Sequence, residues 1–155
     1  MLVVDDEKLF GESIRDHLDE DGVEVLLAHT LADARALLAE QSVDLMLLDN
    51  DLPDGQGLAF LGEQRALGFD GSVLVVTGSP SLDNAVEAMR MGILDYLDKP
   101  VALEELRLAV LRSLEELWTV RREQAQSRSR RAGPERPRSV EAEALSAEVR
   151  FPERN

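Results

Sequence analysis

Short apolar segments alternate with helical patterns along the first 120 residues, and this alternation constrains the fold more than any other feature. The segments are nearly continuous in Val, Leu and Ile, which is typical of strands that are covered on both faces. Five strands are therefore predicted, at Leu2–Val4, Val23–Ala28, Val43–Leu48, Ser72–Thr77 and Ile93–Leu97. Strict alternation of strands and helices favours an α/β fold, in which a doubly wound parallel sheet carries helices on both faces.

The segments between the strands show helical patterns. Five helices are predicted, roughly at Lys8–Asp19, Leu31–Ala39, Gly57–Leu67, Ser81–Met91 and Ala102–Val120. Thr30 and Ser81 each precede such a pattern and are typical N-cap residues. Apolar spacing predicts a buried stripe on two helices, with Leu9, Ile14 and Leu18 on the first and Ala85, Val86, Met89 and Met91 on the fourth.

The last predicted helix carries two sets of apolar residues. Leu103, Leu106, Val110 and Leu117 can cover the sheet, whereas Leu108, Leu111 and Trp118 lie further round the helix. Two interpretations remain open, a broad core stripe and a dimerisation surface that includes Trp118. We expect a domain at 1–120 and a linker or helix extension at 121–138. Residues 139–155 can form a short helix that leads to an output domain absent from these 155 residues.

The charge of the chain is unevenly distributed. Residues 1–120 hold 8 Lys and Arg against 25 Asp and Glu, whereas residues 121–155 hold 9 Arg and 6 Glu. An acidic globular part repels nucleic acid, so direct nucleic-acid binding by residues 1–120 is not expected. The Arg-rich stretch after residue 120 fits a solvated linker better than a phosphate contact, since it lacks aromatic residues.

Membrane insertion and export are also not expected. No run of about 18 apolar residues occurs, and the first apolar stretch meets three acidic residues by Glu7, unlike a signal peptide. The chain has no cysteine, which excludes disulfides and thiolate sites and agrees with a reducing cytoplasm. We therefore expect a cytoplasmic protein.

Polar residues stand at the ends of four predicted strands. Asp5 and Asp6 follow the first strand, Asp49 follows the third, Thr77 closes the fourth and Lys99 lies just after the fifth. Each residue alone has an ordinary explanation as a turn or helix-end residue. Because the carboxyl ends of parallel strands meet at one edge of a sheet, the joint occurrence predicts a binding site there.

These residue types suit phosphoryl transfer. Clustered carboxylates repel one another unless a cation lies among them, and Mg²⁺ prefers such hard oxygen ligands. A carboxylate can attack phosphorus and form an aspartyl phosphate. An ammonium group and a hydroxyl group can stabilise the charge on the phosphoryl oxygens. The sequence therefore predicts a magnesium-dependent phosphoryl-accepting site.

Four stretches of the chain resemble response-regulator receiver domains of two-component signalling. They are Leu2–Glu7, Leu45–Asp49 running on to Pro53 and Gly57, Val75–Gly78, and Asp95–Pro100. The resemblance covers about residues 1–120 and has every hallmark in order. It implies a flavodoxin-like (CheY-like) fold with strand order 2-1-3-4-5, five helices and an extended last helix.

The resemblance also implies a role for each site residue. Asp49 would accept the phosphoryl group from a sensor histidine kinase. Mg²⁺ would be held by the side chains of Asp6 and Asp49, by the backbone carbonyl of Asp51 and, through a water molecule, by Asp5.

Three further positions follow from the same family pattern. Thr77 would bind a phosphoryl oxygen and Lys99 would pair with the phosphoryl group. Tyr96 stands at the switch aromatic position and would turn inward with Thr77, so that the helix 4–strand 5–helix 5 face changes and a homodimer forms or dissociates there or through helix 5. The Lys99–Pro100 bond is expected to be cis.

One departure from the family pattern is the acidic Asp51, two positions after the acceptor. It adds negative charge near the phosphoryl group, and Ser79 lies where family members tune dephosphorylation. Asp49 and Asp51 together also match the start of haloacid-dehalogenase-like phosphatases. That family places its metal-binding acids after the nucleophile, whereas here the acid pair precedes it. We therefore expect a regulatory domain and not an enzyme.

The output of the domain has several interpretations. The resemblance leans towards sigma-54-dependent transcription activators, while a hybrid sensor kinase or a stand-alone receiver remain alternatives. No ATPase motif or DNA-binding helix pair occurs in the 155 residues. His17 and His29 are predicted to be surface residues, since nothing around them indicates a phosphohistidine.

Overall fold

Five parallel strands pair in the order β2–β1–β3–β6–β7. The structure is a computed structural model that describes residues 1–131. Its strands are β1 (Leu2–Val4), β2 (Leu26–Ala28), β3 (Leu45–Leu48), β4 (Asp51–Leu52), β5 (Gly55–Gln56), β6 (Ser72–Thr77) and β7 (Asp95–Asp98). β4 and β5 form a separate antiparallel pair. When the five strands of the main sheet are counted along the chain, β6 is the fourth and β7 the fifth, so the sheet has the predicted order 2-1-3-4-5. The predicted flavodoxin-like fold is confirmed.

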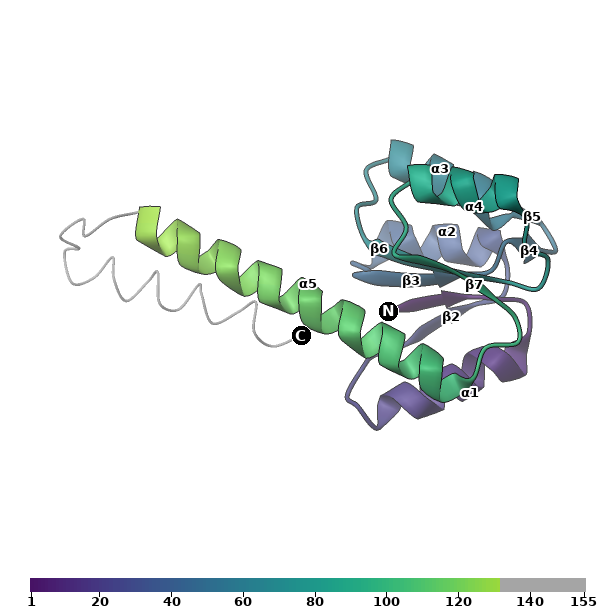
Figure 1. Cartoon of the computed structure of the whole chain (residues 1–155), viewed down its shortest axis with the longest axis horizontal. Helices are drawn as coiled ribbons and strands as arrows, with labels where there is room; N and C mark the ends of the chain where they lie inside the picture. Colours follow the sequence, from purple (N-terminus) through teal and green to yellow (C-terminus); the bar gives the residue numbers. More distant parts are fainter. Residues whose placement is uncertain (132–155) are drawn as a thin grey trace. The chain divides into compact units, whose positions relative to one another are not determined.

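Five helices complete this fold. They are α1 (Lys8–Asp19), α2 (Leu31–Glu40), α3 (Gly57–Ala66), α4 (Leu82–Arg90) and α5 (Leu103–Arg131). Figure 1 shows α2, α3 and α4 on one face of the sheet, and α1 with the first turns of α5 on the other. The two predicted N-caps are confirmed, because the Thr30 and Ser81 side chains accept hydrogen bonds from the N–H groups of Asp33 and Asn84, each at 3.1 Å.

Two apolar layers form the core, one on each face of the sheet. Alternate residues of each strand face opposite layers, so that Met46 and Leu48 of β3 contribute to one layer and Leu45 and Leu47 to the other. All four are at most 2% exposed. Burial of one Leu side chain contributes about 2 kcal/mol to the free energy of folding, so the central strand strongly stabilises the fold.

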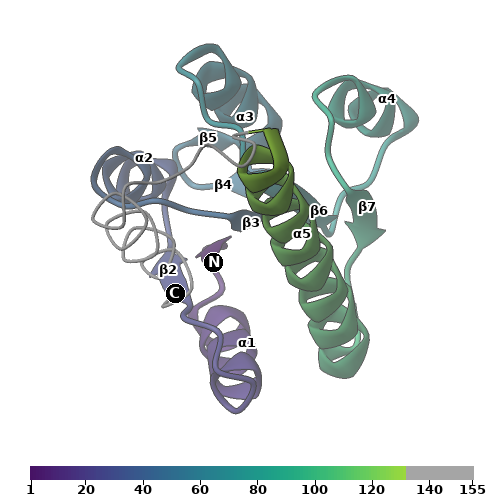
Figure 2. The ribbon, with the colours of Figure 1, turned by 90° about the vertical axis from the view of Figure 1, so that its left-hand side faces the viewer.

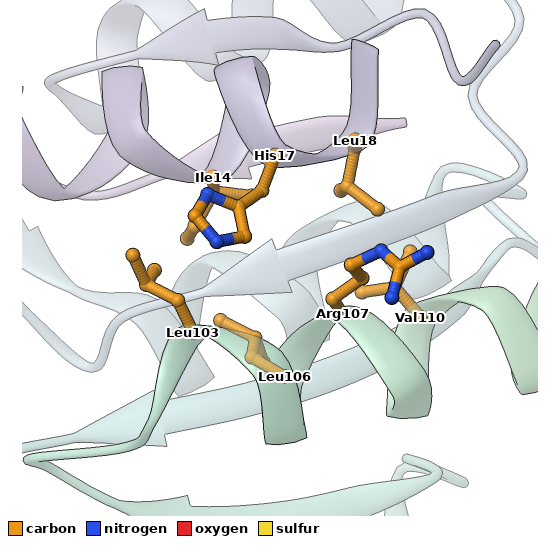
Figure 3. Close-up of a pocket in the computed structure, with 7 residues that line it drawn as sticks. All are labelled: Ile14, His17, Leu18, Leu103, Leu106, Arg107 and Val110. Carbon is orange, nitrogen blue, oxygen red and sulfur yellow. The ribbon is translucent and has the colours of Figure 1, made fainter. Parts of the chain in front are cut away.

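The layer on one face joins α1 to α5 (Figure 3). Ile14 and Leu18 of α1 and Leu106 and Val110 of α5 are all buried. At the end of this contact the guanidinium group of Arg107 donates two hydrogen bonds to the carboxylate of Asp21, at 2.7 and 2.8 Å. These contacts fix the first turns of α5 against the sheet.

Several predicted strands begin too early. Val23 is buried, but its N–H group donates to the carbonyl of Leu18 and closes the end of α1, so β2 begins only at Leu26. Val43 and Ile93 are likewise buried in front of β3 and β7. Apolar burial thus extends beyond the residues that pair in the sheet.

The predicted stripes on α1 and α4 are partly wrong. Ile14 and Leu18 are buried, but Leu9 is 79% exposed. On α4 only Ala88 is buried, whereas Val86 and Met89 are 44% and 53% exposed. Leu9 lies nine residues before Leu18, and at 3.6 residues per turn this spacing places the two on opposite sides of α1, so Leu9 faces solvent. Val86, two residues before Ala88, likewise lies on the far side of α4 from it.

The last described helix continues to Arg131, past the helical pattern that ends at Val120, so the expected extension of this helix is confirmed. Apolar periodicity ends near Val120, but Arg, Gln, Glu and Ala have high helix propensities and continue the helix without it. Residues Met1–Glu116 form one compact unit, and a second unit begins at Leu117. The expected short helix in residues 139–155 lies outside the described residues. Within residues 1–131, no helix has the length and apolar character needed to cross a membrane.

Candidate functional site

Three carboxylates gather at the carboxyl edge of the sheet. Asp5 and Asp6 follow β1 and Asp49 follows β3, and these two strands are neighbours in the sheet. One oxygen from each carboxylate lies within 4.8 Å of those of the other two. Asp5 and Asp49 are 3% and 5% exposed, whereas Asp6 is exposed. The sequence prediction that these three acids come together is confirmed.

The ammonium group of Lys99 lies among these acids. It donates hydrogen bonds to the carboxylates of Asp5 at 2.7 Å, Glu7 at 3.2 Å and Asp49 at 3.3 Å. It also lies 4.9 Å from the ring centre of Phe10, a cation–π contact. Burial lowers the pKa of Lys99, but the hydrogen bond to Asp5 and the charges of Asp5 and Asp49 outweigh it and raise this pKa. Lys99 therefore stays positively charged.

Asp49 has a raised pKa. Burial is the main cause, and the neighbouring charge of Asp5 adds to it. The N–H group of Asp51, at 3.2 Å from Oδ1, and the ammonium of Lys99 lower the pKa but do not fully compensate. A further cation at this carboxylate would thus stabilise its ionised form.

Thr77 and Asp51 lie on a second side of the site. The Thr77 side chain is fully buried, and its hydroxyl donates a long hydrogen bond of 3.4 Å to Oδ2 of Asp51. The same hydroxyl oxygen accepts a hydrogen bond from the N–H group of Ser79 at 3.1 Å. The hydroxyl therefore contacts a carboxylate in this structure, at the position that the family pattern assigns to a phosphoryl-binding residue.

Tyr96 lies half-buried on β7. Its hydroxyl oxygen is 3.4 Å from the N–H group of Ser81, the N-cap residue of α4. The Lys99–Pro100 peptide bond that follows β7 is cis, as expected.

Asn50 and Gly57 connect the loop that carries Asp49 to the start of α3. We did not predict this role for Asn50 from the sequence. The N–H group of Gly57 donates to the carbonyl of Asn50 at 2.8 Å, while Oδ1 of Asn50 accepts from the N–H group of Leu58 at 3.0 Å. A β-carbon on Gly57 would overlap the carbonyl oxygen of Asp49. The start of α3 is thus packed directly against the loop that follows β3.

His29 is a second residue whose position the sequence did not indicate. We predicted a surface residue, but its ring is partly buried and Nδ1 lies 3.0 Å from the carbonyl oxygen of Asp5. The available signal was its place directly after β2, at the same edge of the sheet as Asp5. His17 is exposed, as predicted.

The acid cluster suits a hard divalent cation. Carboxylate oxygens are the ligands that Mg²⁺ prefers, and one or two of them suffice when water molecules complete the shell. Both oxygens of Asp5 accept short hydrogen bonds, from the N–H group of Glu7 at 2.9 Å and from Lys99 at 2.7 Å. Both oxygens of Asp49 also accept hydrogen bonds, but these are longer, at 3.2 and 3.3 Å. The exposed carboxylate of Asp6 is therefore the best placed for direct ligation, and Asp49 is better placed than Asp5.

The model of the family described as response regulator receiver domain matches residues 1–111. The chain is 37% identical over 134 residues to the alginate biosynthesis transcriptional regulatory protein AlgB of Pseudomonas aeruginosa. This match covers 86% of the chain but only 30% of that relative.

Solved structures agree with this match. A CheY-like response regulator receiver domain protein from Methanospirillum hungatei superimposes with a TM-score of 0.70 at 31% identity, covering 74% of this chain and 92% of that one. The beryllofluoride-activated NtrC4 receiver domain dimer gives a TM-score of 0.68 at 35% identity, covering 74% and 95%.

Proposed function

This chain belongs to the response regulator receiver domain family, and on that premise we propose that Asp49 accepts a phosphoryl group. The observation that carries the proposal is the position of Lys99 between two buried carboxylates. Its ammonium group binds Asp49 and Asp5 at the carboxyl edge of the sheet, beside the exposed carboxylate of Asp6. A buried carboxylate, an ammonium group and two further carboxylates thus lie together, as a phosphoryl-accepting site requires.

The proposed step is a transfer between two partners. An oxygen of Asp49 forms a bond to phosphorus while the bond between phosphorus and a histidine nitrogen of the sensor kinase breaks, and the imidazole leaves with the electron pair. Lys99 pairs with the developing charge on the phosphoryl oxygens. Thr77 donates its hydroxyl hydrogen to one of them after leaving Asp51.

Asp6 and Asp49 would bind Mg²⁺ with their side chains, Asp51 with its backbone carbonyl and Asp5 through a water molecule. The ion would neutralise charge on the acceptor and on the incoming phosphoryl group. Support comes from the raised pKa of Asp49, because burial leaves its carboxylate short of positive charge despite Lys99.

In the unphosphorylated site, the carboxylate of Asp51 accepts a hydrogen bond from the Thr77 hydroxyl. Phosphorylation then offers the Thr77 hydroxyl a second anionic acceptor with more charge, and Thr77 leaves Asp51 and moves towards Asp49 while Tyr96 turns inward from Ser81. The face formed by α4, β7 and α5 changes as a result.

That face is also the proposed dimer surface. Leu82, Val86 and Met89 of α4 are 80%, 44% and 53% exposed, and Leu108 of α5 is 48% exposed. A large exposed apolar group of this kind is typical of an interaction surface. We propose that phosphorylation changes the homodimer through this face or through α5.

The output is proposed to be control of transcription, through a domain that follows the receiver. The chain spans less than a third of AlgB, so this relative has room for further domains. A sigma-54-dependent activator is the proposed type. A hybrid sensor kinase or a stand-alone receiver are the alternatives, and they share the same phosphoryl chemistry.

Mass spectrometry tests the acceptor directly. The protein is incubated with Mg²⁺ and acetyl phosphate, and the expected result is the gain of one phosphoryl group at Asp49. Asp49→Asn is expected to gain none, whereas Leu9→Asp, an exposed change on α1, gains one as the wild type does. An unmodified wild type contradicts the role of Asp49 as acceptor. Steady release of phosphate from a small ester that depends on Asp51 favours a phosphatase.

A further inference from the structure

The tip of the β4–β5 hairpin is attached to another helix through Asp54. Oδ1 of this carboxylate accepts a hydrogen bond from the N–H group of Leu31 at 2.9 Å, and Oδ2 accepts one from the N–H group of Ala32 at 3.0 Å. Leu31 and Ala32 are the first two residues of α2. A residue of the acceptor loop thus binds the start of a helix more than 20 residues earlier in the chain.

Asp54 supplies what the N-cap of α2 does not. The first N–H groups of a helix have no partner within the helix. The Thr30 side chain binds the third of them, on Asp33, and leaves the first two free for Asp54. Both hydrogen bonds lower the pKa of Asp54, which therefore remains ionised at neutral pH and suits the positive end of the helix dipole.

The other end of this hairpin forms part of the proposed magnesium site. Asp51 pairs with Gln56 across the hairpin, and the N–H group of Asp51 donates to Oδ1 of Asp49. At the tip, Gly55 lies so close to Leu31 that a β-carbon at residue 55 would meet Leu31 Cδ1 at 3.1 Å. The hairpin, seen between α2 and α3 in Figure 2, is thus held by the site at one end and by α2 at the other.

The start of α2 also contacts the opposite wall of the site. His29, just before the N-cap Thr30, places Nδ1 at 3.0 Å from the carbonyl oxygen of Asp5. Residues 29–32 therefore contact the loop that follows β1 and the hairpin that follows β3. A displacement of the hairpin from α2 would change its distance to the loop that carries Asp5 and Asp6.

We propose that Asp54 is a positioning residue for Mg²⁺ binding. Its carboxylate anchors the hairpin on α2 and thereby sets the position of the Asp51 backbone relative to Asp6 and Asp49. The inference rests on the proposed function, since it requires the cation to bind at Asp6, Asp49 and the Asp51 carbonyl. Outer residues that orient metal ligands commonly change metal affinity by tenfold or more when they are removed.

Thr30→Ala is the matched control for Asp54→Ala. Both substitutions remove a side-chain cap from the same end of α2, so both are expected to lower the melting temperature by a few degrees. Of these two capping side chains, only that of Asp54 belongs to the hairpin. A purely structural role for Asp54 would make the two variants equivalent in every measurement.

Calorimetric titration of the full chain with MgCl₂ distinguishes the two roles. We expect Asp54→Ala to raise the Kd for Mg²⁺ about tenfold and Thr30→Ala to leave it within about twofold of wild type. Asp54→Asn keeps one acceptor oxygen and is expected to fall between them. In NMR spectra without Mg²⁺, the Asp51 amide should shift in Asp54→Ala and not in Thr30→Ala.

Three results would overturn this role. They are a wild-type Kd in both Asp54 variants, an equal rise in Kd in Thr30→Ala, and an Asp51 amide that does not respond to Asp54. If Asp54→Ala is unfolded, the Kd of Asp54→Asn for Mg²⁺ is the deciding measurement.

A wild-type chain that binds neither Mg²⁺ nor beryllofluoride contradicts the proposed function itself. If the wild type binds both and the Asp54 variants bind Mg²⁺ equally well, only the role of Asp54 is contradicted.

Discussion

Gly57 faces the carbonyl oxygen of Asp49 so closely that no side chain can be accommodated between them. The α3 helix begins at Gly57, whose N–H group donates to the carbonyl of Asn50. The loop after β3 and the first turn of α3 are therefore packed backbone against backbone. Because the obstacle is backbone, it cannot rotate away as a side chain would.

Gly57→Ala is therefore expected to destabilise the fold and to move the acceptor. The free energy of unfolding should fall by about 2–3 kcal/mol, and the Asp49 and Asn50 amides should shift in NMR spectra. Gly62→Ala in the same helix is the control. Its β-carbon would meet Met91 Sδ at an ordinary 3.8 Å, so this variant should be unchanged or up to about 1 kcal/mol more stable. Equal effects of the two substitutions would contradict the packing described for Gly57.

Asp49→Asn is expected to stabilise the chain at neutral pH in the absence of divalent cations. Burial raises the pKa of Asp49 above its ordinary 3.8, so the folded state binds its proton more tightly than the unfolded state. The free energy of unfolding therefore falls as the pH rises from 3.8 to the raised pKa. The asparagine has no such proton and should lose this part of the pH dependence.

Urea unfolding in EDTA at a series of pH values measures this difference. The wild type and Asp49→Asn should have similar stabilities in acid and separate as the pH rises. Addition of Mg²⁺ should stabilise the wild type more than the variant, because only the wild type retains this ligand. A variant that is less stable than the wild type at pH 7 in EDTA would contradict the dominance of burial at Asp49.

Arg65 joins three carbonyl groups that lie near the ends of α3 and α4. Its guanidinium donates to the carbonyls of Phe69 at 2.9 Å, Gly71 at 2.8 Å and Met91 at 3.3 Å. It also lies 5.3 Å from the Phe69 ring centre. Arg65→Ala should lower the free energy of unfolding by about 2 kcal/mol, since hydrogen bonds from a charged donor are lost.

Arg35→Ala is the matched control for Arg65→Ala. Arg35 also lies over an aromatic ring, 5.4 Å from that of Phe60, and pairs with the exposed Glu63 at 2.8 Å. Exposed ion pairs contribute little to stability, so Arg35→Ala should lower the free energy of unfolding by less than about 1 kcal/mol. The two variants can be compared by thermal and urea unfolding, and a larger effect of Arg35 would refute the role given to Arg65.

The sequence was sufficient to predict the residues at the strand ends. Asp5, Asp49, Thr77 and Lys99 each follow or close a short apolar run, and parallel strands bring such positions to one edge. This geometry depends only on the order of strands and helices. The order of strands and helices therefore predicts that these four residues lie at one edge of the sheet.

Other features depend on contacts that local sequence does not encode. Asp54 binds α2 only because the hairpin reaches that helix, and His29 meets Asp5 only because β1 and β2 are neighbours. The exposure of Leu9, in contrast, follows from helix geometry, because Leu9 lies on the opposite side of α1 from the buried Leu18. Tertiary placement thus accounts for the residues that we missed, and helix periodicity accounts for the stripe that we misassigned.

Leu82 and Leu9 offer a test of the proposed dimer surface. Both are leucines in the first turn of a helix, 80% and 79% exposed, but Leu82 begins α4 and Leu9 belongs to α1 on the opposite face of the sheet. An aspartate is favoured near a helix N-terminus, so neither substitution should unfold the chain. At a dimer surface, however, a new charge must lose its hydration against apolar side chains.

Leu82→Asp is therefore expected to weaken the dimer formed with beryllofluoride and Mg²⁺ about tenfold, which corresponds to about 1.4 kcal/mol. Leu9→Asp should dimerise as the wild type does. Light scattering over a range of protein concentrations measures both, and Mg²⁺ titration verifies that each variant retains its site. Equal weakening by the two changes would indicate an effect of the added charge alone, because a chain with a net charge of −14 already repels its copy. A dimer that tolerates Leu82→Asp but is lost in Trp118→Asp would place the contact on α5, the second surface proposed from the sequence.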